Sequence, residues 1–220
     1  MLKRVLEPEV MDCPEEAREY DEMDHEAVNR QFVDDLLAGG EVRGDLLDLG
    51  TGTALIPIEL CQRVEECRIM AVDLSTEMLD LARYRLEIAG VTHRIQLEHI
   101  DGKATPFPDA MFDLVISNSI VHHIPEPKLL LREAVRVTKP GGRLFFRDLF
   151  RPDSEDELRR LVETHVADQS ATQQKLFADS LRAALTVEEV QDIVASLGFA
   201  RETVRQTSDR HWTWDALRPE

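Results

Sequence analysis

The sequence predicts an α/β domain built on a doubly wound, mostly parallel sheet. Five short apolar runs, each typical of a strand, are separated by segments in which apolar residues recur at helical spacing. One segment, "FDLVISN" (112–118), contains a continuous apolar run, as expected for a strand that helices cover on both faces. This alternation of strands and helices is the pattern that produces a parallel sheet with helices on both sides.

Three of the five expected strands are followed by the residues that begin and end a helix. Ser75 follows the second strand and can cap a helix that Gly90 ends, while Pro57 is tolerated only in the first turn of its helix. The expected strands are "DLLDLG" (45–50), "CRIMAVDLS" (67–75), "RIQLEHID" (94–101), "FDLVISN" (112–118) and "RLFFRDL" (143–149). The expected helices are 55–64, 75–90 and about 125–137.

The rhythm changes after the fifth strand. Residues 153–184 have the pattern of two polar, amphipathic helices with no strand between them, which predicts a helical insertion. The repeat then resumes with a helix that Thr186 and Glu189 open as a capping box, followed by strand-like "ARETVRQ" and "HWTWDA". We therefore expect one domain over residues 1–220, with a helical lid at 1–40 and the insertion as a substrate cover.

Composition excludes several classes of function. The 220 residues include 43 acidic and 26 basic side chains, so the formal charge is -17 and a nucleic-acid partner is not expected. The three cysteines form no C-x-x-C pair, which predicts neither a disulfide framework nor a metal site. The N-terminus lacks a long apolar core and no stretch is long enough to span a bilayer, so a cytoplasmic protein with no membrane partner is expected.

The loop in "LLDLGTGTALIPIEL" (46–60) predicts a ligand site. Gly50 and Gly52 allow the backbone to turn sharply and approach a ligand, and the helix that follows favours polar or negative groups. Asp73 ends the next strand. Its separation from the glycine loop along the sequence is about that of an acid that binds two ribose hydroxyls. A nicotinamide fingerprint requires a glycine where this chain has Leu55, which counts against a dehydrogenase.

Five motifs in order resemble those of one family. They are "LLDLGTGTA", "AVDLS", "HIDGKATPFPDAMFD", "ISNSIVHHIPEP" and "LREAVRVTKPGGRLFFRD". Together they resemble the class I S-adenosylmethionine-dependent methyltransferases, in the small-molecule, UbiE-like branch, closely over residues 40–150 and loosely over the last thirty or so. Ala54 replaces the family's last loop glycine, a mild departure if the local backbone is helical. The resemblance implies a Rossmann-like sheet of seven strands with the last one reversed.

The resemblance also implies which residues bind S-adenosylmethionine. Asp48 would fix the loop and the cofactor's amino group, Asp73 the ribose, and Asn118 the methionyl end. Two alternatives stay open: Leu74 is equally well explained as core, and Asp73 as a helix-capping acid. The full implied set is Asp48, Gly50, Thr51, Gly52, Asp73, Leu74, Asp101, Gly102 and Asn118.

Other side chains are candidates for catalysis and for acceptor binding. His122 is the candidate base and Arg147 the candidate anchor of an acidic acceptor, since histidine titrates near neutral pH and arginine binds carboxylates in two-point contacts. A positioning role for His122 and an internal salt bridge for the arginines remain open alternatives. The predicted acceptor-binding residues are Tyr20, with Met23 as a second lid contact, His123, Asp148 and Arg151.

The sequence therefore predicts a methyltransferase that uses S-adenosylmethionine and acts on a small, anionic molecule. Transfer of another group from a modified S-adenosylmethionine is one alternative, and a non-catalytic module that binds the cofactor is another. A small-molecule acceptor is the expected partner, a homodimer is left open, and a dehydrogenase is a distant third alternative.

Overall fold

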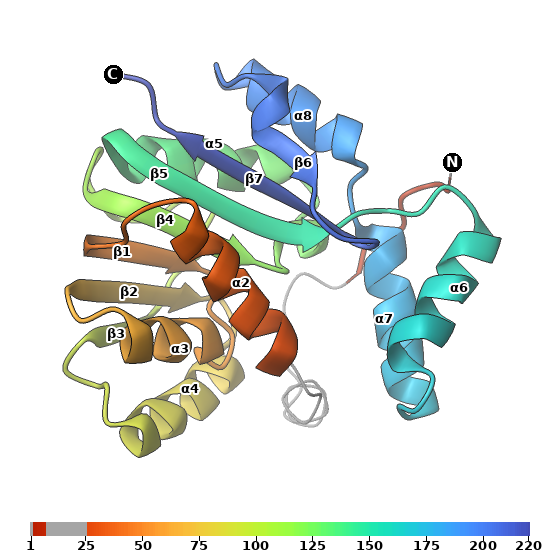
Figure 1. The fold of residues 1–220 in the computed structure, drawn as a ribbon, viewed down its shortest axis with the longest axis horizontal. Helices are drawn as coiled ribbons and strands as arrows, with labels where there is room; N and C mark the ends of the chain where they lie inside the picture. The colour runs from red at the N-terminus through yellow and green to blue at the C-terminus, as the bar shows by residue number, and fades with distance from the viewer. Residues whose placement is uncertain (1, 8–25) are drawn as a thin grey trace.

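The computed structural model describes residues 2–7 and 26–220, which include one seven-stranded sheet (Figure 1). The strand order is β3-β2-β1-β4-β5-β7-β6. Strands β1 to β5 run parallel to one another, whereas β7 is antiparallel to both β5 and β6. The doubly wound sheet predicted from the sequence is thus confirmed, including the reversed last strand.

The elements agree closely with the predicted ranges. The strands are β1 (Gly44–Leu49), β2 (Cys67–Asp73), β3 (Ile95–His99), β4 (Phe112–Asn118), β5 (Thr138–Leu149), β6 (Val204–Gln206) and β7 (His211–Leu217). The helices are α2 (Glu26–Ala38), α3 (Leu55–Arg63), α4 (Thr76–Ala89), α5 (Pro127–Val137), α6 (Glu155–Val166), α7 (Ala171–Ala183) and α8 (Val187–Ser196), with single 3-10 turns η1 (Val121–His123) and η2 (Arg201–Thr203).

Strand β5 differs from its prediction because it begins earlier. It starts at Thr138 and includes the "KPGG" segment, which the sequence assigned to the break between helix and strand. The pairing of β5 with β4 shifts register between Thr138 and Arg143, so the segment is accommodated as an irregularity within the strand.

Helices cover both faces of the sheet because successive strand residues point to opposite sides. On one face, Leu46 of β1 packs in a cluster with Phe32 of α2 and Leu60 of α3. On the other face, the adjacent Leu47 packs in a cluster with Leu130 of α5 and Trp214 of β7. Burial on both sides explains why these strands read as continuous apolar runs.

Helix caps form where the sequence predicts them. The Ser75 hydroxyl accepts a hydrogen bond from the backbone N–H of Met78 at 3.2 Å, and Gly90 ends α4 with φ +69°. At α8, Thr186 Oγ1 accepts from the N–H of Glu189, whose carboxylate in turn accepts from the N–H of Thr186. These side chains satisfy helix-end groups that have no partner within the helix.

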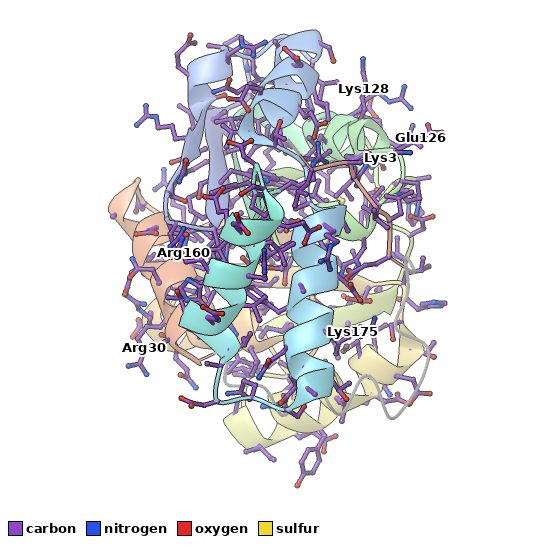
Figure 2. The ribbon with its side chains drawn as sticks, turned by 90° about the vertical axis from the view of Figure 1, so that its right-hand side faces the viewer. Lys3, Arg30, Glu126, Lys128, Arg160 and Lys175 are labelled. Carbon is purple, nitrogen blue, oxygen red and sulfur yellow. The ribbon has the colours of Figure 1, made fainter. Side chains whose placement is uncertain are left out.

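The predicted insertion is the pair α6 and α7, which lie side by side (Figure 2, where Arg160 and Lys175 mark them). Leu161 of α6 and Leu181 of α7 are fully buried in a small cluster that also receives Leu149 from β5. Residues 2–7 lie against α7, where the N–H of Val5 donates to the carbonyl of Arg182. The α6–α7 pair therefore packs at the carboxyl end of β5 (Figure 1).

The N-terminal lid is described only in part. Its described portions are residues 2–7, which lie against α7, and α2, which packs against α3. Tyr20 and Met23 lie outside the described residues. No helix in the described part of the chain combines the length and the apolar character that a bilayer crossing requires.

The buried His211 predicts a fall in stability in acid. Burial, with help from the Arg210 and Arg147 charges, lowers the pKa of His211 to about 3. The unfolded chain therefore binds a proton here between pH 6.5 and about 3 and the folded protein does not, so folding stability falls as pH falls through that window. We expect a loss of about 1.4 kcal/mol per pH unit from this group.

Urea denaturation of the wild type and of His211→Gln at neutral and mildly acidic pH measures this effect. The variant should show a flatter pH dependence, whereas His93→Gln, a change at an exposed histidine, should follow the wild type. Parallel pH profiles for wild type and His211→Gln would show that His211 is not the source.

Candidate functional site

One cavity lies at the carboxyl ends of β1, β2 and β4 and collects all the residues predicted to bind the cofactor. Parallel strands that end at the same edge of a sheet bring distant parts of the chain together there. The predicted residues that line this cofactor cavity are Asp48, Gly50, Thr51, Gly52, Asp73, Leu74, Asp101, Gly102 and Asn118. The structure thus joins four separate motifs of the sequence in one site.

The glycine loop needs glycine at its first position for two reasons. Gly50 has φ +71°, and a Cβ added there would lie 2.3 Å from Cγ2 of Ile120. Gly52 also has a positive φ, +54°, but a Cβ there would meet open space. A side chain at Gly50 would therefore clash with the protein, while one at Gly52 would adopt a strained backbone.

Ala54 does not adopt the backbone that the sequence analysis required of it. A methyl group was expected to fit here if the backbone were helical. Ala54 has φ 60° and ψ 26°, which is the left-handed region. This conformation places Ala54 at the N-cap of α3, where it is fully buried. The methyl group is tolerated at the strain cost, on the order of 1 kcal/mol, that a left-handed non-glycine residue carries.

Asp73 holds the glycine loop as well as facing the cavity. Its Oδ2 accepts a hydrogen bond from the N–H of Gly52 at 2.8 Å, and its Oδ1 accepts from the N–H of Ser75 at 2.9 Å. Burial raises the pKa of Asp73 despite these hydrogen bonds. Because Ser75 is the residue that caps α4, the carboxylate of Asp73 is not required as the helix cap.

Asp48 is the most deeply buried acid of the cavity. It is 3% exposed at the end of β1, and burial raises its pKa to about 7. The nearby Asp73 carboxylate adds to the shift. A buried carboxylate that titrates near neutrality is stabilised in its charged form by a cationic ligand group.

Asn118 and Asp101 complete the polar lining. Asn118 ends β4, and its Oδ1 is buried with no hydrogen-bond partner among the described residues, so it is available to a ligand donor. Asp101 follows β3, where its Oδ1 accepts from the N–H of Lys103 and pairs with Lys103 Nζ at 3.0 Å. The cavity therefore presents acceptor oxygens from the ends of four strands, β1 to β4.

The two histidines of η1 have neighbouring rings, with centroids 4.1 Å apart, but different surroundings. His123 lines the cofactor cavity, whereas His122 is 3% exposed and is not among the lining residues. His122 Nδ1 lies 2.6 Å from Asp148 Oδ1, and its backbone N–H donates to Asp148 Oδ2. Burial by itself lowers the pKa of His122, but the carboxylates of Asp148 and Glu7 outweigh burial and raise it.

The expected basic cluster at the end of β5 is not formed. Arg147 pairs with Asp35 of α2, and Arg151 pairs with Glu189 of α8 at 2.8 Å. Asp148 turns instead to His122, because neighbouring residues on a strand face opposite sides. The internal salt bridges left open in the sequence analysis do form, but with Asp35 and Glu189 and not with Asp148.

Arg147 lines a second cavity that is separate from the first. The residues that line this second cavity come from α2, from β5, from the turn between β6 and β7, and from the start of β7. They are Ala27, Val28, Gln31, Asp35, Arg147, Thr207, Ser208, Arg210 and His211. Val28 lines both cavities, so the two are neighbours across α2.

Several lining residues were not anticipated from the sequence. Met78 lines the cofactor cavity although its spacing on α4 assigned it to the apolar stripe, and Lys103 is a basic residue in an acidic motif. Val28 and Asn29 of α2 also line it, which agrees with a lid at this edge. In contrast, no described residue of the α6–α7 pair lines either cavity.

Known proteins are similar to this chain in sequence and in fold. A family model described as "Methyltransferase domain" matches residues 47–146. The chain is 30% identical over 206 residues to the ubiquinone/menaquinone biosynthesis C-methyltransferase UbiE of Xanthomonas axonopodis pv. citri, which covers 84% of this chain and 79% of that protein. It is 33% identical over 103 residues to the 27-O-demethylrifamycin SV methyltransferase of Amycolatopsis mediterranei, covering 47% of this chain and 38% of that protein.

A solved structure supports the same fold. The S-adenosylmethionine-dependent methyltransferase from Aquifex aeolicus superposes with a TM-score of 0.68 at 18% identity, with 94% of this chain and 98% of that chain covered. The fold and the cavity are those of the class I S-adenosylmethionine-dependent methyltransferases. Within this class, the chain belongs to the UbiE-like family. It spans only 38% of the length of the rifamycin methyltransferase.

The residues of the cavity fit S-adenosylmethionine. The Asn118 Oδ1 has no hydrogen-bond partner among the described residues, and the pKa of the buried Asp48 carboxyl is about 7. Both oxygens can accept hydrogen bonds from the ammonium group of the methionyl end. Asp73 retains acceptor capacity for ribose hydroxyls after its two backbone hydrogen bonds, since a carboxylate offers about four lone-pair sites.

Replacing Asp73 tests its role at the ribose. Asp73→Ala should weaken S-adenosylmethionine binding by about 1 to 3 kcal/mol, the range for hydrogen bonds to a charged group. Calorimetric titration measures the change. Ser75→Ala removes the cap of α4 but keeps the carboxylate, so it should reduce stability more than it reduces affinity. Equal affinity losses in both variants would make Asp73 a structural residue.

The pKa of Asp48 predicts that cofactor affinity depends on pH. Below about pH 7 the carboxyl must release its proton before it can pair with the cofactor's ammonium group, so affinity should fall by up to about tenfold per pH unit as pH decreases. Titrations of the wild type between mildly acidic and mildly basic pH measure the slope. Asp48→Asn should bind more weakly and remove the slope, while the exposed Asp80→Asn should keep it.

Proposed function

We propose that this protein transfers the methyl group of S-adenosylmethionine to a small, anionic acceptor. The observation that carries the proposal is that residues from four motifs line one cavity, where they fit the cofactor. S-adenosylmethionine supplies a sulfonium-bound methyl group that is already a strong electrophile. The remaining task of this chain is to hold the acceptor in line and to exclude water.

The second cavity supports an anionic acceptor. Arg147 and Arg210 are among its lining residues, while Asp35 is its only carboxylate among the described residues. This is an excess of positive charge in a chain whose formal charge is -17. This cavity shares Val28 with the cofactor cavity, and we propose that it holds the acceptor.

Arg147 is well placed to bind an acid group with little further ordering. Its side chain is 4% exposed, its Nε donates to Thr213 Oγ1 at 3.1 Å, and its guanidinium lies 5.8 Å from the ring centroid of Phe32. A guanidinium held in this way loses little conformational entropy when it binds a carboxylate or phosphate.

Methyl transfer itself requires a base only if the acceptor atom carries a proton in its reactive state. His123 lines the cofactor cavity and is the histidine within reach of a bound acceptor, while His122 lies behind it against Asp148. We therefore propose that His122 acts by positioning η1, and that His123 contacts the acceptor.

The alternatives from the sequence make different predictions. Transfer of another group from a modified cofactor would be favoured by a basic residue near the sulfonium that binds a carboxylate, and the candidate Arg147 lines the second cavity and not the first. A non-catalytic module requires the cofactor to bind without turnover. Methyl transfer to a small acceptor is thus the function that the two cavities support best.

The experiment that tests the proposal combines cofactor and acceptor. The purified protein is incubated with S-adenosylmethionine and panels of carboxylated, phosphorylated and neutral small molecules, and S-adenosylhomocysteine formation is followed. Turnover with an acidic acceptor supports the proposal, and turnover only with neutral acceptors refutes the anionic part. Tight cofactor binding with no turnover for any acceptor favours the binding module.

Arg147→Met tests the acceptor site once an acceptor is found. It should raise the acceptor's KM by about 10- to 100-fold, as for loss of a hydrogen bond between charged groups, and leave cofactor affinity unchanged. Arg143→Met is the matched control, because Arg143 is also a buried arginine of β5 in an ion pair, with Asp215, but lines neither cavity. An equal rise in both variants would assign the effect to the sheet.

A further inference from the structure

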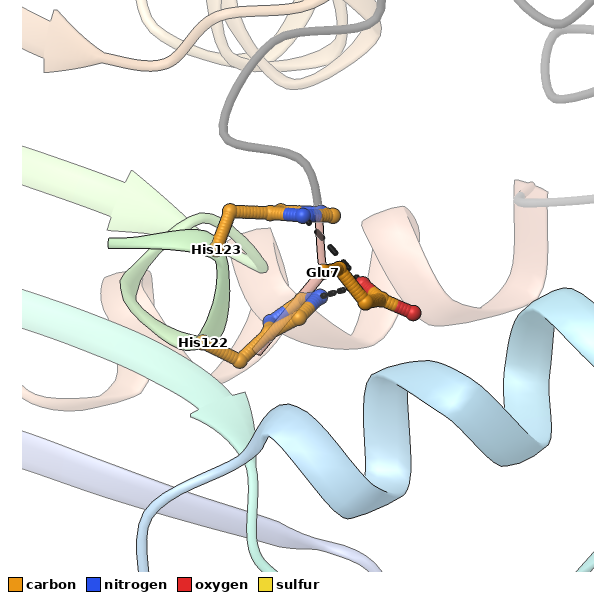
Figure 3. A group of neighbouring side chains, drawn as sticks. All are labelled: Glu7, His122 and His123. Carbon is orange, nitrogen blue, oxygen red and sulfur yellow. Dashed lines mark ion pairs between the residues drawn. The ribbon is translucent and has the colours of Figure 1, made fainter. Parts of the chain in front are cut away.

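Three side chains from two distant parts of the chain, the N-terminal segment and η1, converge beside the cofactor cavity (Figure 3). Glu7, His122 and His123 each present one potential ligand atom, and these atoms all lie within 4.8 Å of one another. Glu7 Oε2 is 3.2 Å from His123 Nδ1 and 4.0 Å from His122 Nε2. One carboxylate oxygen thus faces the ring nitrogens of both histidines.

His122 is held in the orientation that a metal ligand needs. When Nδ1–H donates to Asp148 Oδ1, at 2.6 Å, the neutral ring keeps its lone pair on Nε2, the nitrogen that faces Glu7. Asp148 is itself fixed, because it also accepts from the backbone N–H groups of His122 and Leu149. Metal-binding histidines commonly donate their second nitrogen to a carboxylate in this way.

Glu7 is also held in place. The hydroxyl of Ser180 on α7 lies 3.1 Å and 3.2 Å from its two carboxylate oxygens. Before it in the chain, Arg4 donates to the carbonyls of His122, Ile124 and Ala183, which attaches the N-terminal segment to both η1 and α7. The carboxylate therefore reaches the histidines from a docked segment.

We propose that Glu7, His122 and His123 bind a divalent transition-metal ion, with Zn²⁺ as the best-fitting example. Two imidazoles and one carboxylate form a donor set that zinc uses at sites with an open coordination position. Ligand atoms about 2.0 to 2.1 Å from a tetrahedral ion lie about 3.3 Å apart, which matches the 3.2 Å pair and requires the 4.0 Å pair to approach by about 0.7 Å.

An ion at this site would lie at the edge of the cofactor cavity, because His123 lines that cavity. Three protein ligands leave a fourth position for water or for a donor atom of a bound small molecule. The use of that position in acceptor binding rests on the proposed methyl transfer, whereas metal binding itself does not.

Metal binding is measured without cofactor or acceptor, so its outcome is independent of methyl transfer. Protein freed of metal with a chelator is titrated with Zn²⁺ by calorimetry, and with Co²⁺ by absorption spectroscopy to identify the ligand type. We expect one ion per chain and Co²⁺ bands of a nitrogen- and oxygen-bound ion. A sulfur-to-cobalt charge-transfer band would assign the ion to cysteine and overturn the proposal.

Variants separate the site from adventitious binding. Glu7→Gln and His123→Gln each remove one ligand, and each should weaken Zn²⁺ binding by at least the roughly 10- to 100-fold that loss of an outer hydrogen-bond partner costs. Asp148→Asn tests that outer partner and should fall within this range. His93→Gln removes an exposed histidine and should bind as the wild type does.

Two results would overturn the proposal. Failure of the folded wild type to bind Zn²⁺ or Co²⁺ would identify the cluster as a hydrogen-bonded ion pair only. Unchanged affinity in Glu7→Gln and His123→Gln, with folding verified by circular dichroism, would place any bound ion elsewhere on the protein.

Discussion

The site depends on a hydrogen bond between neighbouring strand ends, from the N–H of Gly52 to the carboxylate of Asp73. The loop after β1 turns through three left-handed residues, Gly50, Gly52 and Ala54, which no regular hydrogen-bond ladder stabilises. Hydrogen bonds from Gly50 and Thr51 to the carbonyl of Val72 attach the same loop to β2.

The consequence is that the backbone around the cofactor cavity is held by the protein's own hydrogen bonds. The loop backbone is positioned by β2, and the side chain that holds it also lines the cavity. Binding then does not have to order the loop, and this saves the conformational entropy that a mobile loop would lose. The strain at Ala54 is acceptable for the same reason, because its neighbours fix the backbone on both sides.

Several arginines of this acidic protein are buried and form ion pairs within the fold, which the composition alone does not predict. Three arginines at four-residue intervals, Arg143, Arg147 and Arg151, connect β5 to Asp215, Asp35 and Glu189, respectively. The first two bring β7 and α2 to one side of the strand, and the third joins α8 beyond its end. Each arginine side chain is at most 10% exposed while its carboxylate partner is 40% to 43% exposed, so part of the scarce positive charge is committed to contacts within the fold.

The sequence predicts the elements of this fold well because burial imposes a pattern on each of them. Strands covered on both faces require apolar runs, and the caps at Ser75 and Thr186 follow from local hydrogen bonding. The residues that the family resemblance implies for cofactor binding line one cavity, since parallel strands end at the same edge of the sheet. The partners of Arg147 were not, because Asp35 reaches it from α2 through packing that no local pattern encodes.

The same limit explains why the composition of the chain suggested no metal site. Glu7 reaches the histidines only because the N-terminal segment docks between η1 and α7, and spacing rules detect ligands that are close in sequence. Turn η1 contacts the N-terminal segment, the cofactor cavity and strand β5. Its His123 lines the cofactor cavity, while its His122 is bound to β5 through Asp148. The turn therefore joins the cavity to the end of β5, and any movement of η1 on ligand binding must change the contacts that both histidines make with Glu7.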